Sequence, residues 1–258
     1  MSFSNTYADN LRATSYAQLE FPGTYHLAFR DLPGLLGKPF WRARVLDFGC
    51  GAGRSTRFLA SLGFNAEGVD ISEAMLTQAR MRDPKGTYVQ VPDGDLSMLA
   101  DDRYDRILSA FTFDNVKQDL KEPLFRHMAR LLKPGGHLLN LVSSEELYRM
   151  EWASFSTEVF QGNRNPSPGD LVFTVMKDIE DSRPVPDIYC PEAHYLELYR
   201  EAGLKRVGVH RPLGVASEPF AWINELEISP WRIDVLERPP KPFATALGRV
   251  WGGQFGPC

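Results

Sequence analysis

The chain has 258 residues, of which 43% are hydrophobic, and this is enough to bury one large core with at most a small appendage. Its formal net charge of −4 at pH 7 and the lack of any run of Lys or Arg argue against nucleic acid as a partner. No apolar stretch reaches the ~18 to 20 residues of a membrane span, and the first ten residues lack the pattern of a signal peptide, so we expect a cytoplasmic protein that does not bind membranes.

Residues 1–41 predict a helical N-terminal cap. Aromatic residues are frequent between Tyr7 and Trp41, and Pro-Gly pairs at 22–23 and 33–34 divide the segment into short helices joined by turns. We expect these helices to form one wall of a pocket for a small-molecule ligand.

Strands and helices then alternate over residues 42–143, the expected cofactor-binding core. The predicted strands cover residues 43–48, 65–70, 87–91, 104–113 and 137–143, and the predicted helices cover 55–63, 72–82 and 117–132. This alternation predicts a doubly wound, Rossmann-like α/β fold with a mainly parallel sheet and helices on both faces.

The second half of the chain is less regular. Its predicted elements are a helix over 145–155, a strand over 171–178, a helix over 192–202 and strands over 205–211 and 230–238. We expect residues 152–190 to be an insertion over the active site and residues 191–238 to complete a seven-stranded sheet whose last strand is antiparallel. Residues 239–258 would be a tail of the same single domain.

A glycine-rich turn follows the first predicted strand, in the segment LDFGCGAGRSTRFL. Gly49, Gly51 and Gly53 allow the backbone to pass close beneath a ligand, and the helix after them offers its amide groups. The spacing is G-x-G-x-G, because Arg54 stands where the dinucleotide fingerprint G-x-G-x-x-G has its third glycine. Asp47 at the strand end would repel a pyrophosphate but suits the ammonium and sulfonium groups of S-adenosylmethionine.

Asp70 ends the second predicted strand, about 20 residues after Gly49, where an acid meets ribose hydroxyls in this topology. A nicotinamide enzyme would share this feature. Asp70 therefore predicts a nucleoside-like ligand without deciding the chemistry.

The ordered segments VLDFGCGAGRSTRFLA, GVDIS, DGDL, YDRILSAF and LLKPGGHLL resemble the motif series of the class I S-adenosylmethionine-dependent methyltransferases, of the small-molecule type. The resemblance covers residues 45–142 and implies S-adenosylmethionine as the cofactor. Each motif alone is modest, but together and in this order they make a strong signal.

The resemblance also implies roles for single residues. The three glycines pass under the methionine part of the cofactor, Asp70 binds the ribose hydroxyls and Ile71 lies against the adenine. Asp95 and Leu96 bind the adenine edge, and Ala110 lies on the segment that runs past the sulfonium toward the acceptor. Asp70 and Asp95 could instead be turn or helix-capping acids.

The acceptor site is expected just after the fourth strand, where Asp114 and Asn115 would face the acceptor. A carboxylate there could accept a proton and the amide could hold a carbonyl, although Asp-Asn is also a common helix-entry pair. Tyr25 is the third catalytic candidate, and Tyr16 is expected to face the sulfonium, because an aromatic face attracts a desolvated cation by roughly 0.5 to 2 kcal/mol. Further candidates for the same space are His26, Trp152 and His194.

The sequence offers no acids and histidines at the spacing of a metal site, and its three cysteines do not predict a disulfide framework. We therefore expect a methyltransferase, monomeric or homodimeric, that acts on nitrogen or oxygen of a small planar or aromatic metabolite. Two alternatives stay open, namely a protein that binds S-adenosylmethionine without methyl transfer and a nicotinamide-dependent oxidoreductase.

Overall fold

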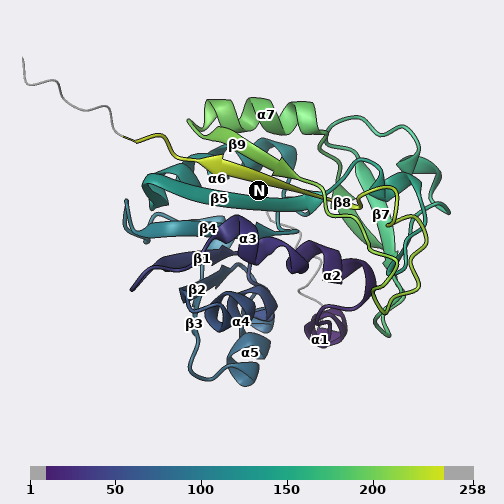
Figure 1. Ribbon diagram of the computed structural model, residues 1–258, viewed down its shortest axis with the longest axis horizontal. Coiled ribbons are helices and arrows are strands. Elements are labelled where there is room, and N and C mark those ends of the chain that lie inside the picture. Colours follow the sequence, from purple (N-terminus) through teal and green to yellow (C-terminus); the bar gives the residue numbers. More distant parts are fainter. Residues whose placement is uncertain (1–9, 241–258) are drawn as a thin grey trace, which may run out of the picture.

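The computed structural model describes residues 10–240 and contains a seven-stranded sheet of strand order β3-β2-β1-β4-β5-β10-β9 (Figure 1). The strands are β1 (Arg44–Phe48), β2 (Asn65–Asp70), β3 (Thr87–Gln90), β4 (Tyr104–Ala110), β5 (Leu132–Ser143), β9 (Lys205–His210) and β10 (Trp231–Glu237). All neighbours pair in parallel except β10, which is antiparallel to β5 and β9. The predicted Rossmann-like sheet with an antiparallel last strand is confirmed.

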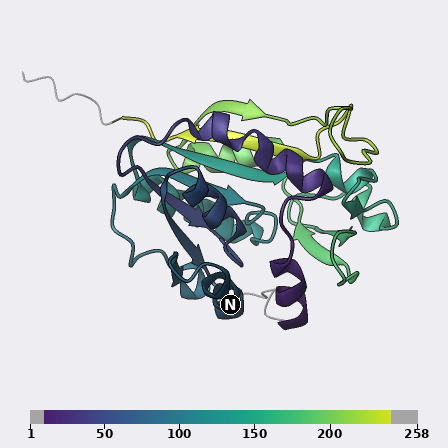
Figure 2. The same cartoon turned by 60° about the horizontal axis from the view of Figure 1, so that its bottom comes forward.

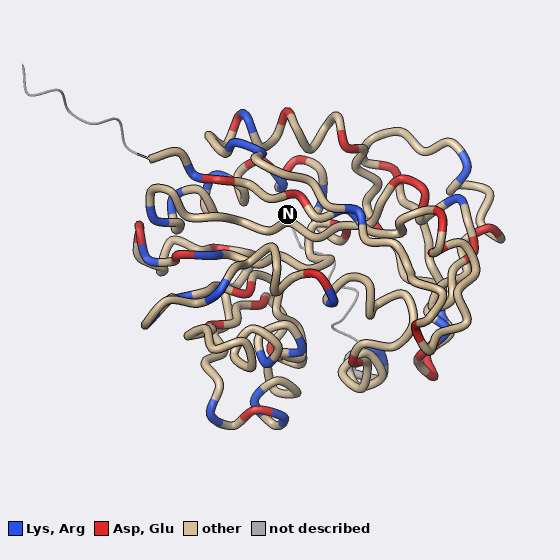
Figure 3. The backbone as a smooth tube through the Cα atoms, in the orientation of Figure 1, with Lys and Arg blue, Asp and Glu red and all other residues tan. Residues whose placement is uncertain are grey.

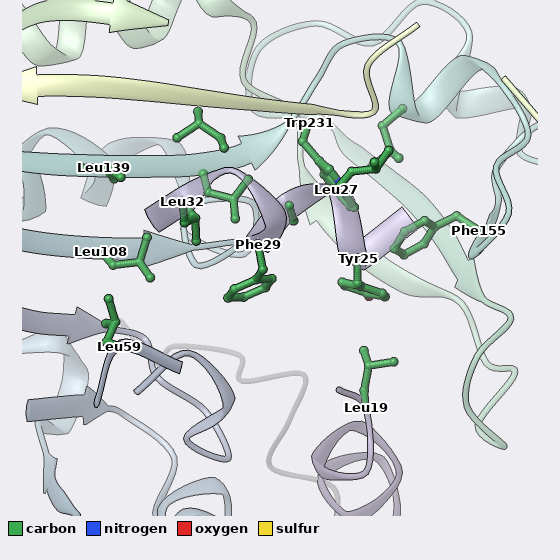
Figure 4. Close-up of a cluster of buried hydrophobic side chains, with 14 of the residues drawn as sticks. Leu19, Tyr25, Leu27, Phe29, Leu32, Leu59, Leu108, Leu139, Phe155 and Trp231 are labelled. Carbon is green, nitrogen blue, oxygen red and sulfur yellow. The ribbon is translucent and has the colours of Figure 1, made fainter. Parts of the chain in front are cut away.

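Helices cover both faces of this sheet. Successive side chains of a strand point to opposite faces, and apolar side chains on both faces need to be covered. Val45 and Leu108 belong to the core beneath α2, α3 and α4, part of which is drawn in Figure 4, whereas Leu46 and Ile107 belong to the core beneath α6 and α7. The helices are α2 (Gly23–Arg30), α3 (Leu32–Leu36), α4 (Arg54–Ser61), α5 (Glu73–Arg82), α6 (Gln118–Leu131) and α7 (Glu192–Glu201).

A second, smaller sheet lies beyond the carboxyl ends of the parallel strands (Figure 1). It is antiparallel, in the order β6-β7-β8, and its strands are β6 (Phe155–Ser156), β7 (Leu171–Met176) and β8 (Val185–Ile188). Helix α1 (Asn10–Ala17) lies between α5 and this sheet (Figure 2). Arg12 of α1 forms a buried ion pair with Asp181, between β7 and β8, at 3.2 Å.

Several elements of the structure differ from the prediction. Strand β4 ends at Ala110 and not at residue 113, because Phe111 adopts a positive φ of 62° that turns the chain. The helix predicted over 145–155 is a single 3₁₀ turn at Leu147–Arg149 followed by β6. Strand β8 escaped prediction because Pro186 interrupts its pattern, and proline is tolerated only at edges of a sheet.

Acidic and basic residues are interspersed along the described chain (Figure 3). No helix within residues 10–240 is long and apolar enough to cross a membrane. Cys50 and Cys190 are buried free thiols. Tyr7, Cys258 and residues 241–258 of the predicted tail lie outside the described residues.

Candidate active site

The glycine-rich turn between β1 and α4 lies at the carboxyl end of β1. Gly49 and Gly51 have φ angles of 73° and 52°, in the region that favours glycine. A Cβ atom on Gly49 would lie 2.2 Å from Oγ1 of Thr112, so no larger residue fits there. Gly53, with φ 78°, is the residue before α4 and packs against Tyr88.

Asp70 closes this turn from the end of β2. Its Oδ2 accepts a hydrogen bond from the Gly51 amide and its Oδ1 accepts one from the Ser72 amide, both at 2.8 Å. Burial raises the pKa of Asp70, and these hydrogen bonds oppose the shift. Because each carboxylate oxygen can accept a second hydrogen bond, Asp70 can still bind hydroxyl groups of a ligand.

Asp47 lies beneath the turn, in contrast to its predicted contact with the cofactor. Its carboxylate is fully buried, and its Oδ2 accepts hydrogen bonds from Ser55 at 2.7 Å and Thr56 at 2.6 Å. Burial raises the pKa of Asp47 to about 6. Since the alternation along β1 directs its side chain toward α4, Asp47 holds the first turn of that helix and lines none of the three cavities that follow.

Three adjoining cavities follow the carboxyl ends of the central strands. The central cavity, of about 620 Å³, is lined by Tyr16, Gly49, Gly51, Asp70, Ile71, Met75, Ala110, Phe111, Thr112, Asn115 and Val116. It shares Gly49, Asp70 and Thr112 with an apolar slot of about 380 Å³. On its other side it shares Tyr16, Phe111 and Asn115 with a third cavity of about 390 Å³, which we name the aromatic cavity.

Asp95 and Leu96, which were predicted to bind the adenine edge, do not line the apolar slot. Its further lining residues are Phe48, Val69, Ile71, Val91, Gly94, Val116 and Leu124. Asp95 is exposed and accepts a hydrogen bond from the Ser97 amide at 2.8 Å, while Leu96 is buried in the core. The 3₁₀ turn Pro92–Gly94 brings Gly94 to the slot in place of these two residues.

The aromatic cavity lies between the N-terminal helices and the small sheet. Its aromatic walls are Tyr16, Tyr25, Phe111, Phe155 and Trp231. Three of these rings, Tyr25, Phe155 and Trp231, lie together in Figure 4, and the ring centroids of Tyr25 and Phe155 are 5.1 Å apart. The polar residues of the cavity are Asp114, Asn115, Ser143, Thr174 and Asp187.

The structure brings the predicted pair Asp114 and Asn115 to this cavity. Oδ2 of Asp114 accepts hydrogen bonds from the amide and the hydroxyl of Ser143, at 3.1 and 3.0 Å. Burial raises the pKa of Asp114 to about 6, against the opposing effects of Ser143 and the charge of Lys121. Asn115 donates to the Phe111 carbonyl, and its buried Oδ1 has no hydrogen-bond partner within the described residues. Asn115 is therefore an open acceptor at the junction of two cavities.

Tyr16 and Tyr25, the two candidates from the N-terminal cap, both line the aromatic cavity. The hydroxyl of Tyr25 donates to Sδ of Met176 at 3.3 Å. The guanidinium of Arg54 lies 5.5 Å from the ring centroid of Tyr16 and 4.9 Å from that of Tyr25, so these rings already contact a cation. The remaining candidates line none of the three cavities, namely His26, Trp152 and His194.

Among the lining residues that escaped the sequence analysis are Met75, Thr112 and Asp187. A signal for Asp187 existed, because Val185 and Asp187 stand two residues apart and therefore share one face of a strand. The sequence analysis did not predict that residues 185–188 form a strand, so this signal was not used.

Residues 45–136 match the family described as methyltransferase domain. This segment contains the glycine-rich turn, Asp70 and the residues after β4 that line the central cavity, within the sheet order described above. The chain contains a methyltransferase domain of the class I S-adenosylmethionine-dependent type. Its cofactor is accordingly S-adenosylmethionine, and the comparisons support neither of the two alternatives.

Known relatives agree with this assignment. N-demethylindolmycin N-methyltransferase from Streptomyces griseus is 29% identical to this methyltransferase over 214 residues, which are 81% of this chain and 89% of the relative. A crystal structure of an S-adenosylmethionine-dependent methyltransferase from Mesorhizobium loti shares the fold, with a TM-score of 0.60 and 20% identity over 82% of this chain and 98% of that one.

A second solved structure with this fold holds ligands. It is the 1,6-didemethyltoxoflavin-N1-methyltransferase of Burkholderia thailandensis with bound 1,6-didemethyltoxoflavin and S-adenosylhomocysteine. Its TM-score is 0.51 at 19% identity, over 82% of this chain and 76% of that chain.

Proposed function

We propose that this methyltransferase transfers a methyl group to a nitrogen or oxygen atom of a small planar or aromatic molecule bound in the aromatic cavity. One observation carries the proposal. The central cavity, beside the glycine-rich turn, meets a cavity walled by five aromatic side chains, and the two share Tyr16, Phe111 and Asn115. Flat aromatic walls favour a planar ligand, because offset and edge-on ring contacts stabilise it.

The residues of the central cavity and the apolar slot fit S-adenosylmethionine. Gly49 and Gly51 present bare backbone to the central cavity, and Asp70 keeps acceptor capacity for the ribose hydroxyls. Ile71 and the apolar slot suit a flat purine ring, while Ala110 lies on the path to the aromatic cavity. When bound, S-adenosylmethionine supplies a methyl group on a positively charged sulfur.

The chain contributes position and a dry environment. Tyr16 and Phe111 line both cavities, so their rings stand where a bound acceptor would have to be shielded from water. The open Oδ1 of Asn115 can accept a hydrogen bond from a donor at this junction. Asp114, at the wall of the aromatic cavity, can take the proton that an N–H or O–H acceptor loses. Holding the acceptor in line supplies much of the rate.

Two named relatives support an acceptor of this kind. The relatives from Streptomyces griseus and Burkholderia thailandensis are both named as N-methyltransferases of small molecules. This supports a small-molecule acceptor here, and the aromatic walls of this chain's own cavity support a planar one.

Acceptor screening with purified protein tests the proposal. S-adenosylhomocysteine formation is measured for a panel of planar heterocycles and phenols, with aliphatic amines and acids of similar mass as the comparison set. We expect turnover with at least one planar acceptor, and a loss of about tenfold or more in kcat/KM in Asn115→Ala. Turnover confined to the aliphatic set would refute the planar acceptor, and no turnover with any acceptor would refute the proposed function.

A further inference from the structure

Two acidic side chains stand on one wall of the aromatic cavity, although they come from distant parts of the chain. Asp114 follows β4, Asp187 lies on β8, and their exposed fractions are only 6% and 8%. The amide of Ile188 donates to the carbonyl of Asp114 at 2.6 Å, so the end of β8 is held against the segment that carries Asp114. Unpaired carboxyls are rarely buried unless they have a function.

Each of these carboxyls keeps one oxygen open. Oδ2 of Asp114 is bonded to Ser143, and Oδ2 of Asp187 accepts from the Tyr148 hydroxyl at 3.2 Å. Within residues 10–240, Oδ1 of either carboxyl has no hydrogen-bond donor and is not buried away from the cavity. No Lys or Arg of the described chain lies within 4 Å of either carboxyl. The open oxygens are therefore available to a ligand.

Two basic side chains lie near the pair but form no ion pair with either carboxyl. Lys121 of α6 is buried and donates to the Phe113 carbonyl, and Arg232 of β10 is paired with Asp234 at 3.0 Å. Burial raises the pKa of Asp187 well above its ordinary value, and repulsion from Asp114 adds to the shift. Repulsion between the two carboxyls favours a state in which the pair keeps one proton, and the oxygens that carry no proton accept hydrogen bonds.

We propose that Asp114 and Asp187 together bind the N–H edge of a planar nitrogen heterocycle and that the methylated atom is one of its nitrogens. The inference rests on the proposed function and narrows its acceptor. An ionised phenol would be repelled by the negative charge of the ionised carboxyl, whereas an N–H edge donates to the open oxygens. Aromatic walls then hold the two faces of the ring.

The proton balance fits this pair. The nitrogen forms a bond to the methyl carbon, the carbon–sulfur bond breaks and its electron pair stays on sulfur. The proton of the acceptor N–H moves to the open oxygen of whichever carboxyl is ionised and leaves later to solvent. S-adenosylhomocysteine and the N-methylated heterocycle are the products, and no oxidant or further reactant is needed.

Two probes of similar shape test the proposal by calorimetry on the protein saturated with S-adenosylhomocysteine. One is 2-aminobenzimidazole, which carries a ring N–H and an amino group on one edge, and the other is 2-methylbenzoxazole, which has no N–H. We expect 2-aminobenzimidazole to bind at least about tenfold more tightly, and Asp187→Asn to reduce that preference to about threefold or less. Asp178→Asn, which removes an exposed carboxylate two residues after the end of β7, is the matched control and should change nothing.

The affinity of Asp187→Asn for S-adenosylhomocysteine reports whether the variant is folded, because Asp187 lies outside the central cavity and the apolar slot. Equal binding of both probes to the wild type, or an unchanged preference in Asp187→Asn, overturns the proposal, as does a failure of 2-aminobenzimidazole to bind. Turnover of phenols together with such a failure would leave the proposed methyl transfer standing, whereas absence of turnover with every acceptor would refute the proposed function itself.

Discussion

The amide of Gly51 donates a 2.8 Å hydrogen bond to Oδ2 of Asp70, so the carboxylate at the end of β2 holds the glycine-rich turn at the end of β1. Replacing Asp70 removes both this bond and the proposed ribose acceptor. Asp70→Ala should therefore lower the affinity for S-adenosylmethionine and S-adenosylhomocysteine by about 30-fold or more in a calorimetric titration. Glu73→Ala, an exposed acid at the start of α5, is the control and should bind both normally. NADH should bind to none of these proteins, and tight NADH binding to the wild type would contradict the cofactor assignment.

Gly49 is a position where the backbone itself demands glycine. Because φ is 73° and an added Cβ would lie 2.2 Å from Oγ1 of Thr112, Gly49→Ala should lower the free energy of unfolding by about 2 to 3 kcal/mol and weaken cofactor binding. Gly34→Ala, with no atom within 4 Å of its Cβ and an ordinary helical position in α3, should stabilise by up to about 1 kcal/mol. Urea denaturation measures both, and equal stabilities of the two variants would contradict this account.

The raised pKa of Asp114, about 6, has opposite consequences for activity and stability. Its carboxylate form, which would take the proton, accumulates above pH 6, so kcat/KM should rise through that pH. The folded chain binds this proton more tightly than the unfolded chain does, so the contribution of Asp114 to stability is full below about pH 4 and is lost as pH rises through 6.

Asp114→Asn separates these two effects. Relative to the wild type, the free energy of unfolding of the variant should rise between pH 4 and pH 7, because the variant has no buried carboxyl to ionise. Its residual kcat/KM should lose the rise near pH 6. A pH–rate profile and urea melts at several pH values measure both, and a variant that keeps the wild-type profile would exclude Asp114 as the proton acceptor.

The buried ion pair between Arg12 and Asp181 fastens α1, which carries Tyr16, to the small sheet. Arg12→Ala should release α1 while leaving Asp181 paired with Arg183 at 2.7 Å. We expect S-adenosylhomocysteine to dissociate about three- to tenfold faster, since Tyr16 lines the central cavity, and hydrogen exchange to speed up in α1 alone. Faster exchange throughout the main sheet would instead indicate that the pair stabilises the whole fold.

Tyr25 contributes a ring to the aromatic cavity, and its hydroxyl donates to Sδ of Met176. Tyr25→Phe should therefore keep kcat/KM within about threefold of the wild type, because the loss of one hydrogen bond to sulfur is small. Tyr25→Leu should lower the affinity for the acceptor about tenfold without changing the affinity for S-adenosylhomocysteine. A loss of a hundredfold or more in Tyr25→Phe would show that the hydroxyl takes part in the chemistry.

Local patterns in the sequence determined the cofactor half of the site. Each strand from β1 to β5 is a short apolar run followed by a turn or a helix signal, and Ser72 caps α5 by accepting from the Met75 amide. Gly49, Gly51 and Asp70 could be placed because strands of one parallel sheet end at the same edge. These features depend on neighbours within a few residues, so the sequence alone carries them.

The tertiary structure decided which acids reach the cavities. Asp47 and Asp95 stand in the right segments but point to α4 and to solvent, since the direction of a side chain follows from strand alternation and turn geometry. Asp187 reaches Asp114 only because β8 folds back across the end of the main sheet, 73 residues further along the chain. The sequence by itself determined the sheet and its glycine-rich turn, because these depend on the local hydrophobic pattern and on the backbone freedom of glycine. The pairing of Asp114 with Asp187 in the aromatic cavity arises from packing between distant segments, which no local pattern encodes.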